Sequence, residues 1–133
     1  MKLEIKQLMF TLSVASLVGM ASNAHAQQCG LGTLFGTYST VTTGLNPTPT
    51  AAVDVMTFDG QGNLSITGTT SQNGVISRRV GLAGSYSVNA DCTGSWLAVN
   101  GAAFDLVIIG QGSEVVFIGT NGNTIVTGQM KHQ

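Results

Sequence analysis

Beyond Cys29 the chain alternates between short apolar runs and small polar turns. The runs are rich in Val, Ile, Thr, Tyr and Phe, and the residues between them are mostly Gly, Asn and Asp. Runs of this composition are typical of β-strands, in which alternate residues share a face. No window shows apolar residues at the three-and-four spacing of an amphipathic helix with helix formers around them. The predicted strands cover residues 34–42, 52–58, 64–70, 75–80, 83–89, 95–99, 104–109, 114–118 and 124–130.

The connections between these strands are short. Asn73-Gly74, Asn100-Gly101 and Asn121-Gly122 are pairs that readily take the positive φ angles of tight hairpins. Connections this short join antiparallel neighbours, because a parallel crossover needs a dozen residues or more. A meander of this kind must protect its edges, and closure into a ring is the simplest way. We therefore expect an all-β fold, a small antiparallel up-and-down barrel of about eight strands, with a β-sandwich as the second choice.

One connection differs from the others. The segment 43–51 contains Pro47 and Pro49, which cannot belong to a central strand. The sequence predicts a longer loop here, at one rim of the barrel.

The first 26 residues predict export. Lys2 and Lys6 precede an apolar stretch over residues 8–20, and Ala24-His25-Ala26 follows as a small-x-small cleavage site. The apolar stretch is too short for a bilayer core, which needs roughly 20 residues. We therefore predict a signal peptide over 1–26 with cleavage after Ala26. A single β-barrel domain over 27–133, without a membrane span, would then be periplasmic or secreted.

The mature chain has two cysteines, Cys29 and Cys92. Two cysteines in an exported protein most often form one disulfide, because the periplasm and the exterior are oxidising. No Cys-x-x-Cys spacing suggests a redox or metal-binding pair instead. We predict a structural disulfide that ties the N-terminal segment to the middle of the chain.

Charge is scarce, at 8% of the chain, and this excludes several classes of function. Three basic side chains in the mature part face five acidic ones, so there is no basic surface for nucleic acid. The apolar content also argues against disorder. His132, beside the C-terminus, is the one histidine of the mature chain, which leaves too few ligands for a zinc site and no supported imidazole for a catalytic triad. We expect no metal and no cofactor.

The charges within the predicted strands are the candidates for chemistry. Asp54, Asp105 and Glu114 each lie in a strand whose two faces are otherwise mostly apolar, so each is either a rim or surface charge or an acid inside the barrel. Burial would raise the pKa of an interior acid unless Arg78 or Arg79 paired with it. Such an acid could transfer protons. Asp54, Asp105, Glu114 and Arg78 are the weak catalytic candidates, and Trp96 is either core or ligand platform.

One segment resembles a known group of proteins. Gly84-Ser85-Tyr86-Ser87-Val88-Asn89-Ala90-Asp91-Cys92-Thr93-Gly94 is similar to a stretch of small exported bacterial proteins of unknown function, in which a Gly-x-Tyr strand leads into Asp-Cys-Thr-Gly. In those proteins an earlier Cys precedes a first Gly-x-Tyr strand. The motif covers eleven residues, and the wider pattern covers most of the mature chain. The resemblance implies a lipocalin-like or allene-oxide-cyclase-like barrel, supports the disulfide, and implies no functional residue.

Three hypotheses for function follow. The first is a non-enzymatic barrel that binds a small apolar ligand in its lumen or at its mouth. The second is a cyclase or isomerase that uses an interior carboxylate. The third is a surface or matrix protein that acts through its exposed sheet. The lining of the lumen tests the first two hypotheses. A lumen filled by Phe58, Phe104, Phe117, Trp96 and methyl groups would leave no room for a ligand, whereas a hollow lumen with an acid inside would favour chemistry.

Overall fold

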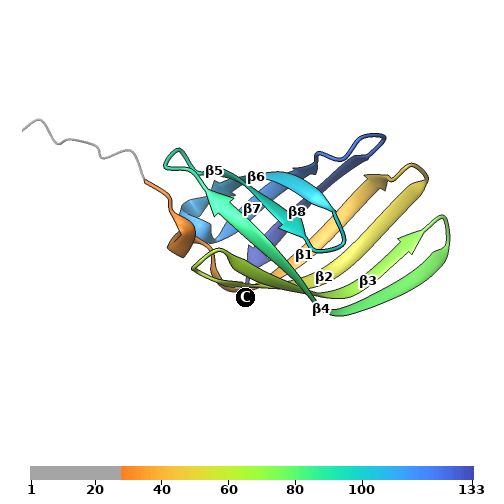
Figure 1. The fold of residues 1–133 in the computed structure, drawn as a ribbon, viewed down its shortest axis with the longest axis horizontal. Helices are drawn as coiled ribbons and strands as arrows, with labels where there is room; N and C mark the ends of the chain where they lie inside the picture. The colour runs from red at the N-terminus through yellow and green to blue at the C-terminus, as the bar shows by residue number, and fades with distance from the viewer. Residues whose placement is uncertain (1–27) are drawn as a thin grey trace, which may run out of the picture.

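The structure, a computed structural model, describes residues 28–133, and the predicted signal peptide lies outside the described residues. Eight antiparallel strands form a closed barrel in which each strand pairs with the next and β8 pairs back with β1 (Figure 1). The strands are β1 (Phe35–Leu45), β2 (Pro49–Asp59), β3 (Asn63–Gln72), β4 (Val75–Val88), β5 (Thr93–Ala98), β6 (Ala103–Ile109), β7 (Glu114–Gly119) and β8 (Ile125–His132). The predicted up-and-down barrel is confirmed, and the sandwich is not formed.

Two details differ from the predicted strands. Segments 75–80 and 83–89 are one strand, β4, because Gly81 continues the chain through a β-bulge instead of ending it. The predicted rim loop over 43–51 is also wrong in length, since β1 continues to Leu45 and pairs there with Pro49 at the start of β2. Proline is tolerated at this first strand position, where its missing N–H interrupts no central ladder.

The two ends of the barrel are built differently. One end, at the left of Figure 1, receives the N-terminal segment with the single-turn 3-10 helix η1 (Leu31–Thr33). The hairpin tips of β1–β2 and β3–β4 lie at the other end. Within residues 28–133 the helical segments are single turns, and no helix there has the length and apolar character to cross a membrane.

Side chains plug the end that carries η1. Leu34, Tyr38 and Phe58 are almost fully buried there, and the rings of Tyr38 and Tyr86 both meet Phe58 edge to face. The Tyr38 hydroxyl donates to the Gly112 carbonyl at 2.6 Å, and the Tyr86 hydroxyl lies 2.9 Å from the Leu31 carbonyl. Both tyrosines of the Gly-x-Tyr motifs therefore close this end of the barrel.

The predicted disulfide secures this plug. Cys29 and Cys92 are bonded, which links the segment before η1 to the β4–β5 turn. The Cys29 N–H also donates to the Ala90 carbonyl at 3.1 Å. The segment that carries Leu34 is thereby held against the barrel.

Candidate functional site

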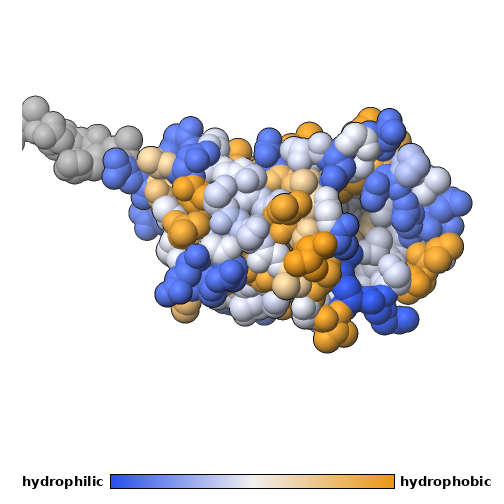
Figure 2. Space-filling view, viewed as in Figure 1, coloured by the Kyte–Doolittle hydropathy of each residue, from blue (hydrophilic) through white to orange (hydrophobic). Residues whose placement is uncertain are grey.

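The other half of the lumen is hollow. A cavity of about 440 Å³ opens at the end with the hairpin tips, within the usual range for small-molecule sites. Its larger apolar lining residues are Met56, Ile66, Leu82, Trp96, Phe104, Phe117 and Val126. Figure 2 shows a recess in the molecular surface toward the same end. The lumen is thus plugged at one end and available to a ligand at the other.

Polar side chains join the loops at the mouth of this cavity. The Thr124 hydroxyl donates to the Asn46 side-chain oxygen at 3.1 Å. The Asn121 side chain donates to the Gly101 carbonyl at 3.0 Å and accepts from the Ala103 N–H at 2.9 Å. These bonds connect the β7–β8 loop to its neighbours on both sides, so the mouth is held in shape by the protein itself.

An ion pair between Asp54 and Arg79 lies in the lining of the cavity, on the inner side of the barrel. Arg79 donates from Nε and Nη2 to both carboxylate oxygens of Asp54, at 2.9–3.1 Å. The Asp54 side chain is 6% exposed and that of Arg79 is 29% exposed. Bidentate pairing of this kind holds both groups in one geometry. Of the residues that line the cavity, Asp54 and Arg79 are the only charged ones.

A glycine between the two partners makes the pair possible. Asp54 on β2 is opposite Gly68 on β3, and Gly68 is opposite Arg79 on β4. A Cβ atom at Gly68 would lie 2.3 Å from Oδ1 of Asp54. Arg79 therefore reaches Asp54 across a strand that has no side chain at this position.

Burial dominates the acid–base behaviour of Asp54. Desolvation raises the pKa of this carboxyl above its ordinary value, while the hydrogen bonds and positive charge of Arg79 act in the opposite direction. The ion pair thus compensates only part of the cost of placing the carboxylate inside the barrel.

Three buried polar atoms of the cavity lining have no hydrogen-bond partner within residues 28–133. They are Oγ1 of Thr40, Oγ1 of Thr70 and Nε1 of Trp96. Thr40 is 3% exposed and Trp96 is 6% exposed. Each of the three atoms has less than 1 Å² of accessible surface, so they lie behind the cavity wall and are closed off from a ligand in the lumen.

The other predicted site residues lie elsewhere. Asp105 and Arg78 are exposed on the outer face of the barrel, and Glu114 begins β7 on the outer face beside the buried Val115. The interior arginine is Arg79, one residue beyond the predicted candidate Arg78. The structure therefore brings together Asp54 and Arg79 and separates Asp105, Glu114 and Arg78 from them.

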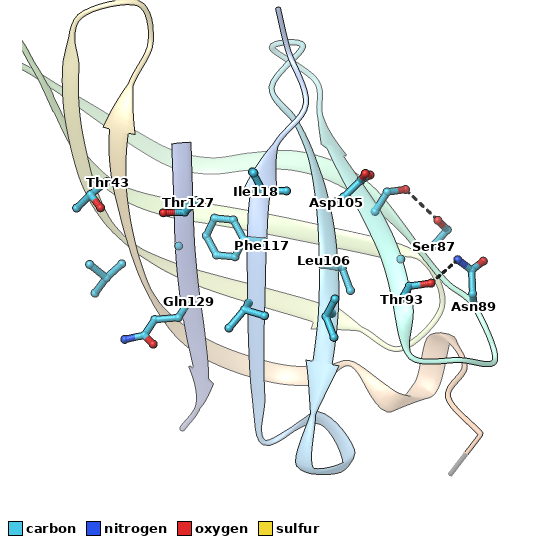
Figure 3. Close-up of a pocket in the computed structure, with 16 residues that line it drawn as sticks. Thr43, Ser87, Asn89, Thr93, Asp105, Leu106, Phe117, Ile118, Thr127 and Gln129 are labelled. Carbon is cyan, nitrogen blue, oxygen red and sulfur yellow. Dashed lines mark hydrogen bonds between the residues drawn. The ribbon is translucent and has the colours of Figure 1, made fainter. Parts of the chain in front are cut away.

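Asp105 lines a second depression, on the outer wall (Figure 3). This groove of about 880 Å³ crosses β1 and β4–β8, and its lining includes outward-pointing Thr, Val and Ile side chains. Ser87 bonds to Ser95 at the β4–β5 side of the groove, and Asn89 bonds to Thr93 there. Its polar groups are thus already paired or exposed to solvent, which makes the lumen the better candidate site.

Thr40 and Thr70 were not among the predicted site residues. The available signal was alternation, since Thr40 shares the inward face of β1 with Tyr38, and Thr70 that of β3 with Ile66. Threonine is common in strands because its β-branched side chain suits them, so its presence alone does not indicate a site. Only the closed barrel shows that these two threonines line the cavity. No three His, Cys, Asp or Glu side chains in the described region come together as metal ligands.

Comparison with known proteins supports the fold alone. No known protein family and no curated protein matches the chain. A solved structure of a redesigned β-barrel is similar, with a TM-score of 0.53 and 15% sequence identity, over 77% of this chain and 94% of that one. The chain is an eight-stranded antiparallel β-barrel with one disulfide, Cys29–Cys92.

Proposed function

We propose that this protein binds a small, largely apolar molecule in the open half of its barrel. The observation that carries the proposal is the cavity of about 440 Å³, whose lining combines apolar side chains with a few polar ones and the Asp54–Arg79 ion pair. A mostly apolar pocket with a few convergent polar groups is the usual form of a small-molecule site. The outer groove also has apolar side chains, but it lies open on the outer wall and would not enclose a ligand.

Nile red, an uncharged dye that fluoresces in apolar surroundings, is a direct probe of the cavity. We expect it to bind the mature protein with a fluorescence increase. Quenching or a shift in the emission of Trp96, the single tryptophan of the chain, should accompany binding. No dye binding would overturn the proposal.

Two neighbouring alanines of β2 provide a matched pair of variants. Ala52 lines the cavity, whereas Ala51 is exposed on the outer face. Ala52→Phe should fill part of the cavity and leave less room for the dye. We expect it to weaken dye binding at least tenfold, a loss of about 1.4 kcal/mol in binding free energy. Ala51→Phe should bind as the wild type does. Equal binding by both variants would place the dye outside the lumen, with circular dichroism showing that both fold.

The interior Asp54 favours a second function, proton transfer in a cyclase or isomerase. A carboxylate in the lumen could remove a proton from a bound substrate and return it to another atom of the same molecule. Incubation with methyl naphthyl ketone in D₂O tests this, because a general base would speed deuterium incorporation at the methyl group. Asp54→Asn should abolish that acceleration while it retains Nile red. Equal deuterium incorporation with and without the protein would show that the protein does not act as a general base on this ketone.

We also propose that the protein is exported to the periplasm or beyond. The disulfide supports this, because such bonds persist in oxidising compartments. Cell fractionation and N-terminal sequencing should find mature protein that begins at Gln27, outside the cytoplasm. A cytoplasmic protein with an intact N-terminus would contradict it.

A further inference from the structure

We propose that the free edge of β4 binds an extended strand of another protein, one that presents an acidic side chain between two apolar ones. The site is residues 75–82, outside the lumen, so the inference goes beyond the proposed binding of a small molecule and does not depend on it. It follows from the unpaired backbone of this stretch and from the side chains that it carries.

The backbone of residues 75–82 is a template for another strand. One of its sides pairs with β3, whereas β5 pairs with residues 84–88, and the last bond on that side runs from the Val99 N–H to the Ala83 carbonyl at 3.0 Å. In Figure 1 the β3–β4 hairpin projects past the end of β5, at the right of the view. The N–H and C=O groups of such an edge can bond to an added strand, as in domains that recognise extended peptides.

Alternation places a positive charge in the middle of the outer face of this edge. Arg79 faces the lumen and bonds to Asp54, so its neighbour Arg78 faces outward, where it is exposed. Ile76, 51% exposed, and Val80, 87% exposed, flank Arg78 along the strand. Figure 2 shows hydrophobic and hydrophilic side chains next to each other over this part of β4. An added strand would therefore meet a cation between two apolar side chains.

The charge of this edge selects the partner. Residues 75–82 contain two arginines and no acidic residue. If two copies of the chain paired edge to edge about Arg78, the two Arg78 side chains would be directly opposite, and like charges in that position destabilise a sheet. An acidic side chain opposite Arg78 forms a favourable pair instead, and β-branched residues two positions away pack on Ile76 and Val80. The edge thus favours a different protein over a second copy.

A short peptide tests the pairing directly. Acetyl-Thr-Val-Thr-Glu-Thr-Val-Thr-amide presents its glutamate between two valines on one face of a strand, with threonine on the other face. Titration of the mature protein should shift the NMR signals of amides in residues 75–82. Hydrogen exchange there should also slow, because backbone groups of the edge become bonded. Unchanged signals and exchange in this stretch at millimolar peptide would overturn the proposal.

Reversal of charge on each partner distinguishes a paired strand from general attraction. The peptide with lysine in place of glutamate should bind about threefold more weakly or worse, and so should the glutamate peptide to Arg78→Glu. The lysine peptide should regain affinity for Arg78→Glu. Lys131→Glu makes the same change of charge at an exposed position of β8 and should bind the glutamate peptide as the wild type does. Equal effects of the two protein variants would overturn the assignment to β4.

The protein without peptide supplies the remaining outcome. Sedimentation should show a monomer at the concentrations of the titration. A dimer whose formation slows exchange in residues 75–82 would overturn the proposal and assign the edge to a second copy. Nile red binding is measured in parallel: its loss alone overturns the proposed function of the lumen, whereas failure of the peptide alone overturns only the inference about β4.

Discussion

At the scale of single residues, one row of opposite positions on three strands allows the ion pair to form inside the barrel. Asp54, Gly68 and Arg79 are directly opposite one another on three consecutive strands. The ion pair spans the middle strand because glycine leaves its space open. The pair occurs within the wall of the cavity, where a single buried charge would be too costly.

The raised pKa of Asp54 predicts a specific dependence of stability on pH. A carboxyl whose pKa is higher in the folded state favours folding while it is protonated, and this contribution is lost as pH rises through the folded pKa. Relative to Asp54→Asn, the wild type should therefore gain stability as pH falls from neutral to below the ordinary value of 3.8. Urea unfolding of both proteins across this range measures the difference.

The comparison with Asp54→Asn removes the contribution of other acids. Hydrogen bonds from neighbouring residues lower the pKa of Asp59 and Asp91, so these two act in the opposite direction, and equally in both proteins. A stability difference that shrinks on acidification would contradict the prediction.

Gly68→Ala should destabilise the protein by about 1–3 kcal/mol, the usual range for overpacking. The added Cβ would lie 2.2 Å from the Val53 carbonyl and 2.3 Å from Asp54. Gly32→Ala is the matched control, because a Cβ there meets nothing within 4 Å, and it should change stability by less than about 0.5 kcal/mol. Urea unfolding measures both, and equal effects would show that the space at Gly68 is not needed.

At the scale of elements, β4 differs from the other strands. Its residues 84–88 pair with β5, whereas residues 75–79 and 82 pair with β3 and have no partner on the other side in the described barrel. The bulge at Gly81, whose N–H donates to Thr67 Oγ1 at 2.9 Å, separates the two parts. The exposed Val80 lies on this unpaired part, beside Arg79 and the cavity.

This division predicts uneven hydrogen exchange along β4. About half of the amides in residues 75–82 face the unpaired edge and should exchange near unprotected rates, because local opening needs no strand to separate. Amides of residues 84 and 85, which pair with β3 on one side and β5 on the other, should be protected. Exchange followed by NMR measures each amide, and uniform protection would indicate that another segment covers the edge.

At the scale of the whole molecule, the barrel combines a filled end with a hollow one. The filled end contains the aromatic plug around Phe58 and the disulfide, and the hollow end contains the cavity. Burial of the plug supplies apolar stabilisation, at roughly 25 cal/mol per Å² removed from water. The open half can therefore retain unpaired polar groups without loss of the fold.

Removal of the disulfide should be costly to the whole domain. Cys29 and Cys92 are 63 positions apart, and the chain-entropy model gives about 4 kcal/mol for a loop of this length. The double variant Cys29→Ser, Cys92→Ser should lose about that much free energy of unfolding in urea, with reduced wild type as the control. A loss below about 1 kcal/mol in both would show that other contacts hold η1 and Leu34 in place.

The sequence by itself determined the class of fold and the covalent link. Alternating apolar positions, Asn-Gly turns and short connections require antiparallel neighbours, and a meander of this length closes to protect its edges. The pairing of Cys29 with Cys92 followed from their number and the predicted compartment. The alternation also placed Asp54 on one face with Met56 and Phe58, without showing which face is inside.

Only the tertiary structure decided which charges are interior and whether the lumen is hollow. Both faces of the strands are largely apolar, so period-two alternation cannot distinguish inside from outside for Asp54, Asp105 or Glu114. The pairing of Arg79 with Asp54 depends on Gly68 of the strand between them. The space left in the lumen depends on inward side chains from all eight strands together, and this sum exists only once the ring is closed.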